Sequence, residues 1–282
     1  MLKVKFITDS SSDLPKSTAE ELGVDVLPLG ISFGNESYLD GVDITAEAFY
    51  AKLRNCTELP KTSQLNRFAF EEALTPYRGT DVTLVLLLIG AEMSSTYSAA
   101  QEAVRSLGME EQVILFDTGL VTFALAALVT EGMRIAESAK SKAELEENLT
   151  RMRDRIRLYA YIDDLKYLRY GGRLSAASLR IAKVLRIHPV VTLDKKVEVI
   201  SKQIGKAKCV HFIIDKIKEE ADLSHPLYFG NSDCREEADA FEKRVLADVP
   251  GCHADPKMHD IGPTVGTHAG PGCFGVAFIA KQ

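Results

Sequence analysis

The sequence contains no tryptophan and no pair of cysteines separated by two residues. Its five cysteines are an odd number and lie far apart in the chain: Cys56, Cys209, Cys234, Cys252 and Cys273. This pattern favours free thiols in a reducing compartment over a disulfide framework or a zinc site.

Long apolar runs are also missing. The longest mostly apolar stretches, residues 82–91 and 120–129, are too short for a helix that must cross roughly 30 Å of hydrocarbon. The first nine residues have no extended apolar core and no small-residue cleavage site, so we expect no signal peptide. The sequence therefore predicts a cytoplasmic protein that does not span a membrane, and transient contact with a membrane surface stays open.

Positive charge is scarce, with 34 Lys and Arg against 40 Asp and Glu, a net charge of -6. Because non-specific nucleic-acid binding needs a positive surface, we expect no nucleic-acid partner. No Gly-x-x-x-x-Gly-Lys-Ser/Thr segment occurs, which excludes a P-loop nucleotide site. Asp9 and Asp13 could suggest a magnesium site, but Asp13 is better explained as a helix cap, and we expect no metal or cofactor.

What the chain has is a regular alternation of apolar strands and helical patterns over its first 160 residues. We expect strands at 4–9, 24–33, 82–89 and 113–117, and helices at 70–77, 97–107, from 120 onward and at 141–156. Ser141 and Glu144 form a capping box at the start of the last helix. This alternation predicts a parallel sheet with helices on both faces.

The second part of the chain has a different order of predicted strands and helices. Residues 189–200 predict a hairpin that turns near 194–196, followed by a helix at 210–217, a strand at 227–230 and a helix at 238–245. A glycine-rich stretch, 262–275, leads into a last strand at 276–280. We predict two α/β domains, 1–158 with a parallel sheet and 159–282 with a mixed or antiparallel sheet, and a ligand at their junction.

Five hydroxyl- or glycine-rich segments lie next to predicted strands or helices: 8–12, 62–64, 94–96, 171–175 and 266–272. Unpaired N–H groups at a helix start favour an anion. Each segment alone is better explained as a helix cap or turn, and the presence of five in one chain weakens that explanation without removing it. Ser32 lies in a Gly-x-Ser-x-Gly pattern, but it falls inside an apolar run with no helix after it, so we reject a serine nucleophile.

The sequences Ile7-Thr8-Asp9-Ser10, Thr62-Ser63-Gln64, Met93-Ser94-Ser95-Thr96-Tyr97, Gly171-Gly172-Arg173 and Gly266-Thr267-His268-Ala269-Gly270-Pro271-Gly272 belong together in one pattern. This set resembles the DegV family of bacterial fatty-acid-binding proteins along essentially the whole chain. The resemblance implies that a long-chain fatty acid lies in an apolar tunnel with its carboxylate at the domain junction. It implies also that a partner fatty acid kinase phosphorylates the carboxylate, and that this chain is not itself an enzyme.

Carried over residue by residue, the resemblance implies that the hydroxyls of Thr62 and Ser94 bind the carboxylate, and that Arg173 and His268 complete a polar network. The other residues of the implied site are Asp9, Ser10, Ser63, Ser95, Thr96, Thr267 and Gly270. Charge-assisted hydrogen bonds contribute roughly 1.5–3 kcal/mol each. The tail contributes about 0.8 kcal/mol per buried CH₂, so tail burial should dominate affinity and the head-group residues should set orientation.

Two parts of the family pattern differ in this chain. Gly90 and Ala91 stand where the family usually has two serines, Ser95 stands for a glycine, and Thr118 for a serine. A basic residue that helps to dock the kinase corresponds here to Ile204. The neighbours Lys202 and Lys206 could take its place.

Two alternatives stay open. One is a small-molecule enzyme related to dihydroxyacetone kinase subunits, in which His268 would hold a ketone covalently. Turnover of a small ketone that is lost in His268→Ala would favour that enzyme. The other is a divergent member that binds a different amphipathic carboxylate.

Overall fold

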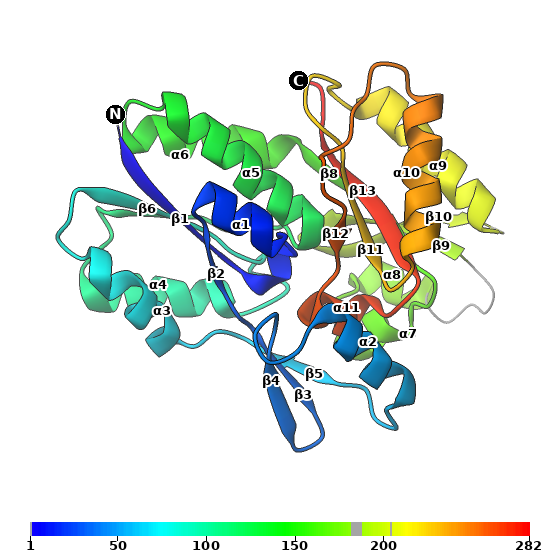
Figure 1. The fold of residues 1–282 in the computed structure, drawn as a ribbon, viewed down its shortest axis with the longest axis horizontal. Helices are drawn as coiled ribbons and strands as arrows, with labels where there is room; N and C mark the ends of the chain where they lie inside the picture. The colour runs from blue at the N-terminus through cyan, green and yellow to red at the C-terminus, as the bar shows by residue number, and fades with distance from the viewer. Residues whose placement is uncertain (1, 182–187, 204) are drawn as a thin grey trace.

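The computed structural model describes residues 2–181, 188–203 and 205–282. Two large sheets lie side by side, the first with blue and cyan strands and the second coloured from green to red (Figure 1). The first sheet is parallel and the second is mixed, which confirms the predicted α/β class.

The first sheet has four strands in the order β2-β1-β6-β7. They are β1 (Lys3–Asp9), β2 (Asp25–Leu27), β6 (Val82–Leu87) and β7 (Val113–Leu115). Around them lie η1 (Ser10–Ser12), α1 (Lys16–Leu22), α3 (Arg67–Leu74), η2 (Thr75–Tyr77), α4 (Thr96–Leu107), α5 (Thr122–Ser138) and α6 (Lys142–Arg155). Helices α3 and α4 cover one face and α5 and α6 the other, so β6 is buried on both sides, as its unbroken apolar run predicts.

The second sheet has six strands in the order β10-β9-β8-β13-β11-β12. They are β8 (Ile156–Tyr161), β9 (His188–Asp194), β10 (Lys196–Gln203), β11 (Tyr228–Ser232), β12 (His259–Asp260) and β13 (Cys273–Ile279). The helices of this part of the chain include α7 (Lys166–Gly171), α8 (Ala176–Ile181), α9 (Lys206–Glu220) and α10 (Arg235–Asp248). The predicted hairpin is confirmed, with Lys195 at its turn in the left-handed region at φ +60°. The predicted boundary at 158/159 lies inside β8.

Helix α5 is packed between the two sheets. It contacts β1 and β6 of the first sheet and β8, β11 and β13 of the second. Its side chains are buried on nearly every side, as the sequence predicts for a helix that is apolar almost all round. The start of α5 therefore lies where the two sheets meet.

The predicted single strand at 24–33 is wrong, because the chain changes sheets within it. β2 pairs with β1, whereas β3 (Gly30–Phe33) pairs with β4 (Glu36–Leu39) and β5 (Lys61–Ser63) in a third, antiparallel sheet. Pro28 lies between them and has no N–H to donate to a ladder. This small sheet leads into α2 (Ala46–Asn55) and carries Thr62.

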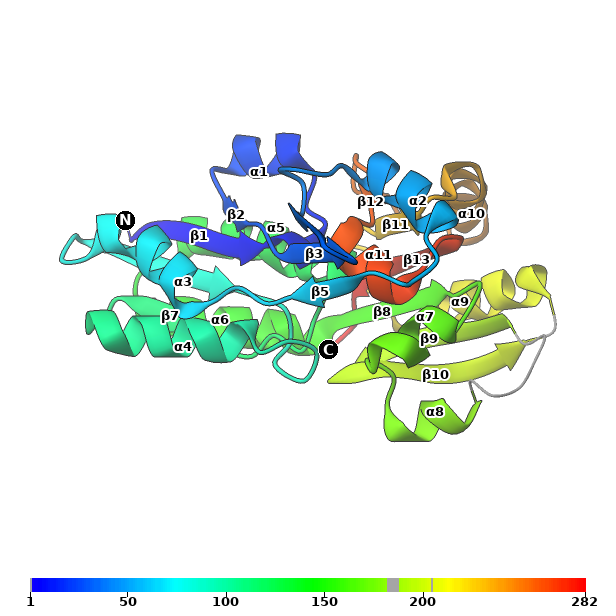
Figure 2. The ribbon, with the colours of Figure 1, turned by 90° about the horizontal axis from the view of Figure 1, so that it is seen from below.

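The glycine-rich stretch 262–275 contains a helix that the sequence did not predict, α11 (Pro263–Ala269). Its seven residues include a central glycine, so its own helix propensity is low. Packing against α2, α7 and β5 stabilises it, and Figure 2 shows it against β5. The residue Gly266 allows this packing, since a Cβ there would lie 2.5 Å from the Tyr50 hydroxyl.

The prediction that Asp13 caps a helix start is also wrong. Asp13 ends the η1 turn in the left-handed region at φ +49°, and Pro15 precedes α1. Its buried carboxylate accepts hydrogen bonds from the Thr122 hydroxyl at 2.6 Å and the Gly262 N–H at 2.8 Å. Asp13 thus ties the start of α5 to the start of α11.

Within the described ranges, no helix has the length and apolar character needed to span a bilayer. Nor do three or more His, Cys, Asp or Glu side chains of those ranges meet in a group that could hold a metal ion.

Candidate functional site

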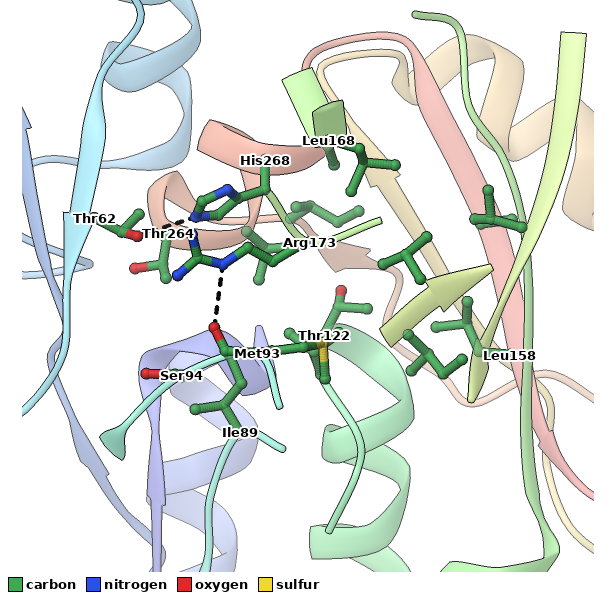
Figure 3. A pocket seen from close by; sticks show the side chains of 18 of the residues that line it. Thr62, Ile89, Met93, Ser94, Thr122, Leu158, Leu168, Arg173, Thr264 and His268 are labelled. Atoms are coloured by element: carbon green, nitrogen blue, oxygen red, sulfur yellow. Dashed lines mark hydrogen bonds between the residues drawn. The ribbon is translucent and has the colours of Figure 1, made fainter. Parts of the chain in front are cut away.

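A cavity of about 410 Å³ lies at the start of α5, within the size range of small-molecule sites. Four side chains from distant parts of the sequence line it: Thr62 of β5, Ser94 before α4, Arg173 after α7 and His268 of α11. Figure 3 shows Thr62 and Ser94 on one side, Leu158 on the far side, and Arg173 between them. The cavity therefore has a polar end and an apolar end.

His268 and Thr62 form the first contact of the polar end. Thr62 Oγ1 lies 3.0 Å from His268 Nε2, drawn as a dashed line in Figure 3. Burial, with the positive charge of Arg173 as a smaller cause, lowers the pKa of His268 to about 4. The imidazole is thus neutral at pH 7, and its buried Nδ1 makes no hydrogen bond to any described residue.

The Arg173 guanidinium is held by two backbone carbonyls. Its Nε donates to Met93 O at 3.1 Å, and Nη1 donates to Gly171 O. Burial lowers the pKa of Arg173, but a guanidinium stays charged in proteins. Its Nη2 donates to no residue that the structure describes, so it is available to an anion.

Glycine is required at positions 171 and 172 for two different structural reasons. A Cβ at Gly171 would lie 2.0 Å from His268 Nδ1, so a larger residue would displace the imidazole. Gly172 ends α7 in the left-handed region at φ +70°, a conformation that favours glycine. The two glycines therefore place Arg173 and His268 in the same cavity.

Ser94 has a structural role as well as a place in the lining. Its Oγ accepts the N–H of Thr96, the first residue of α4, at 3.3 Å and lies 2.9 Å from Thr96 Oγ1. The hydroxyl thus stabilises the turn that leads into α4, whereas the N-cap residue, Ser95, makes no side-chain cap bond. Ser94 Oγ can still donate toward the cavity, because a hydroxyl has one donor and two acceptor sites.

The apolar end is the inner face of the second sheet. The described side chains of that face that line the cavity are apolar: Leu158, Ala160, Val191, Leu193, Val197 and Cys273, with Ile162 just after β8. Phe274 also lines the cavity, but its ring packs on the other face of the sheet, stacked on Tyr161. On β8 the side chains alternate, and Tyr159 and Tyr161 pack instead in the cluster that contains α9 and α10. Alternation along the strand therefore turns one face toward the cavity and the other toward the two helices.

Six of the predicted site residues line the cavity: Thr62, Ser63, Ser94, Ser95, Arg173 and His268. The other five do not line it: Asp9, Ser10, Thr96, Thr267 and Gly270. Asp9 accepts the N–H of Ile89 at 2.8 Å, and Ser10 Oγ accepts that of Leu29 at 3.0 Å. Because Ile89 and Leu29 do line the cavity, Asp9 and Ser10 support its wall.

The remaining three have structural places, two within their own helices and one between α11 and α7. Thr96 is fully buried in α4, and the Thr267 hydroxyl donates to Pro263 O in α11. Gly270 lies against the Tyr167 ring, where a Cβ would come within 2.2 Å of Cδ2. They hold α4 and α11 in place.

Among the described residues, the predicted site lacked four polar residues of the lining: Gln64, Glu92, Thr122 and Thr264. Thr264 precedes His268 by one helical turn, a signal that becomes readable only once α11 is known to be a helix. Thr122 starts α5 at φ +54°, which is unusual for a β-branched residue. Its hydroxyl bond to Asp13 holds that conformation.

One departure from the family pattern has a local explanation. A Cβ at Gly90 would lie 2.8 Å from Gly119 Cα, so a serine there would require the backbone to shift. Ile204 lies outside the described residues. Lys202 is exposed, and Lys206 pairs with Glu237 at 3.6 Å.

The fold and the cavity together define an α/β protein with a cavity between two sheets that is polar at one end and apolar at the other. A family model described as "Uncharacterised protein, DegV family" matches residues 3–281, and the chain belongs to that family. It is 30% identical to a DegV domain-containing protein of Caldanaerobacter subterraneus, over the whole of both chains.

Solved structures share the fold. One titled "Fatty Acid Binding of a DegV family Protein", from Thermus thermophilus, has a TM-score of 0.89 and 24% identity, covering 99% of this chain and 100% of that one. A stearic-acid-binding protein of Eubacterium ventriosum has a TM-score of 0.88 and 24% identity, covering 99% and 98%.

Proposed function

We propose that this chain binds a long-chain fatty acid, with its carboxylate at Thr62, Ser94 and Arg173 and its tail along the second sheet. The observation that carries the proposal is the division of one cavity into a cationic, hydroxyl-bearing end and a wholly apolar sheet face. The proposal is supported by the two similar solved structures, which are of a fatty-acid-binding and a stearic-acid-binding protein.

The chemistry of the polar end suits a carboxylate. Arg173 supplies a charged donor, and the two hydroxyls supply neutral ones. The neutral His268 can either donate to an oxygen or hold the Thr62 hydroxyl in position. Since each buried CH₂ contributes about 0.8 kcal/mol, the tail supplies most of the affinity and the polar end fixes its direction.

The test of binding is the ligand itself. The gently purified protein is denatured and extracted, and mass spectrometry should find a long-chain acid at about one per chain. Delipidated protein should then take up the added acid with the same stoichiometry. Delipidated, folded protein that never takes up an acid would contradict the proposal, and a ketone adduct on His268 in the intact mass would favour the enzyme.

We propose further that the chain presents the carboxylate to a fatty acid kinase rather than catalysing a reaction. The exposed residues Ser63, Gln64 and Ser95 line the cavity, which puts its polar end at the surface, whereas its sheet face is buried. In this step a carboxylate oxygen attacks the γ-phosphorus of ATP bound to the kinase, and ADP leaves.

The presentation step has a direct assay. Loaded protein, ATP and a purified fatty acid kinase subunit are mixed, and hydroxylamine converts any acyl-phosphate to a hydroxamate. Hydroxamate should form only when all three are present. Formation without the kinase would show that this chain is itself the enzyme, and no formation with an active kinase would remove presentation but leave binding intact.

A further inference from the structure

Phe123 lines the cavity from the first turn of α5, and only 1% of its surface is exposed. Its ring lies directly on the backbone of Gly230 in β11. A Cβ at Gly230 would lie 2.1 Å from Cδ1 and 2.5 Å from Cε1 of the ring. The position of the ring therefore depends on the absence of a side chain at residue 230.

The sheet beneath the ring has almost no side chains at this level. The register pairs Gly230 with Gly275 of β13, and Gly275 with Ala160 of β8. Cross-strand partners point to the same face of a sheet, and Ala160 lines the cavity. At Gly275 a Cβ would lie 2.7 Å from Ala160 Cβ, so β8 itself closes the space there. The bare backbone that the Phe123 ring covers is therefore that of Gly230, on the β11 side.

On the other side of Ala160 the wall is made by larger sheet residues, Val191 of β9 and Val197 of β10. A tail that extends from the polar end would therefore lie between these two valines and Phe123. Replacing Phe123 with a small residue would open the β11 side.

We propose that Phe123 determines which fatty-acid tails fit, by closing the β11 side of the cavity against tails that bend in mid-chain, and that Gly230 sets how far its ring withdraws. This inference rests on the proposed binding of a fatty acid and deepens it. The inference predicts that the cavity binds straight, saturated tails more tightly than tails bent by a cis double bond.

The experiment measures the ratio of the dissociation constants of oleate and stearate, which have the same head group and the same number of carbons. Phe123→Ala should shift the ratio in favour of oleate by about tenfold, the lower end of what one small change in an apolar pocket gives. Gly230→Ala should shift it the opposite way, because the added methyl pushes the ring into the cavity. In the double variant, the Gly230 change should have little further effect, because the ring is gone.

The matched controls are Gly132→Ala and Phe6→Ala. Gly132 is also in α5, and a Cβ there would lie 2.9 Å from Leu149 Cδ2 and 3.0 Å from Phe6 Cε1. Neither Phe6 nor Leu149 lines the cavity. These variants share the steric change and the loss of a buried ring, but they should leave the ratio unchanged.

Near-UV circular dichroism and thermal melting show which variants fold. If Gly230→Ala does not fold, the oleate-to-stearate ratio of Phe123→Ala alone tests the inference. A folded Phe123→Ala that binds both acids in the wild-type ratio overturns the inference, as does an equal shift in the controls. If the wild-type chain binds neither acid, it is the proposed function that fails.

Discussion

Replacing Arg173 with glutamine tests the polar end of the cavity. The change removes the Arg173 guanidinium from the lining and its bonds to Met93 O and Gly171 O, but keeps a polar, uncharged side chain. If a carboxylate binds here, the variant loses a charge-assisted hydrogen bond. Such bonds contribute about 1.5–3 kcal/mol, which corresponds to a loss of roughly 10- to 150-fold in affinity.

A second effect of the same change can be measured on a neighbouring side chain. The positive charge of Arg173 is one cause of the low pKa of His268, after burial. In Arg173→Gln the pKa of His268 should rise above about 4 and stay below its ordinary value, because burial remains. NMR titration of the imidazole follows this shift.

The binding assay is calorimetric titration of delipidated protein with a fatty acid and, separately, with its methyl ester. The ester has the same tail but no negative charge, so its affinity should be nearly equal in the wild type and the variant. Arg169→Gln, at an exposed position on α7 outside the lining, is the matched control and should bind the acid normally. Equal losses for acid and ester, or no loss for the acid, would refute the placement of the carboxylate beside Arg173.

Three further predictions concern the hydroxyls, the histidine and a buried carboxylate. Thr62→Ala and Ser94→Ala should each weaken acid binding by about 1–3 kcal/mol by calorimetry; a large fall in melting temperature in both would mean that the hydroxyls serve only the fold. The pKa of His268 in the folded chain, about 4, lies below its ordinary 6.5, so the unfolded chain binds this proton first and stability is lost as pH falls from 6.5 toward 4. The free energy of unfolding falls by at most about 3 kcal/mol for this reason. Measured by urea unfolding, it should fall less in His268→Gln than in the wild type between pH 6.5 and pH 4. An identical pH dependence in the two proteins would contradict the low pKa. Asp13→Ala should lower the free energy of unfolding by about 1–3 kcal/mol, because the Thr122 hydroxyl loses its buried acceptor; Asp13→Asn keeps an acceptor and should lose less, and equal losses would argue against the bond.

Local patterns were sufficient to predict most of the fold. Half of the predicted capping box at the start of α6 is confirmed, because the Glu144 N–H donates to Ser141 Oγ at 3.2 Å. The Glu144 carboxylate accepts the N–H of Lys140 at 2.9 Å instead of that of Ser141. The hairpin of β9 and β10 and the buried α5 were also predicted. In each case the signal lies within a few neighbouring residues, so the periodicity of the sequence is enough to detect it.

The parts that sequence reasoning missed depend on distant contacts. Helix α11 is short and rich in small residues, and it is held by α2, α7 and β5 rather than by propensity. Thr122 and Phe123 line the cavity only because Asp13 and Gly230 lie against them. No spacing within the sequence indicates that these pairs meet. The motif residues Thr62, Ser94, Arg173 and His268 were found through the family pattern, and the structure brings them to one cavity.

The position of α5 between the sheets limits how this protein can be divided or recombined. The helix is encoded with the first sheet, yet it supplies part of the covering of the second. A fragment that ends after α6 would expose the side of α5 that faces β11 and β13, and the complementary fragment would lack both that covering and Thr62. In chimeras of different relatives, α5 should therefore pack well only when the strands that it contacts in the second sheet, β8, β11 and β13, come from the same parent as α5.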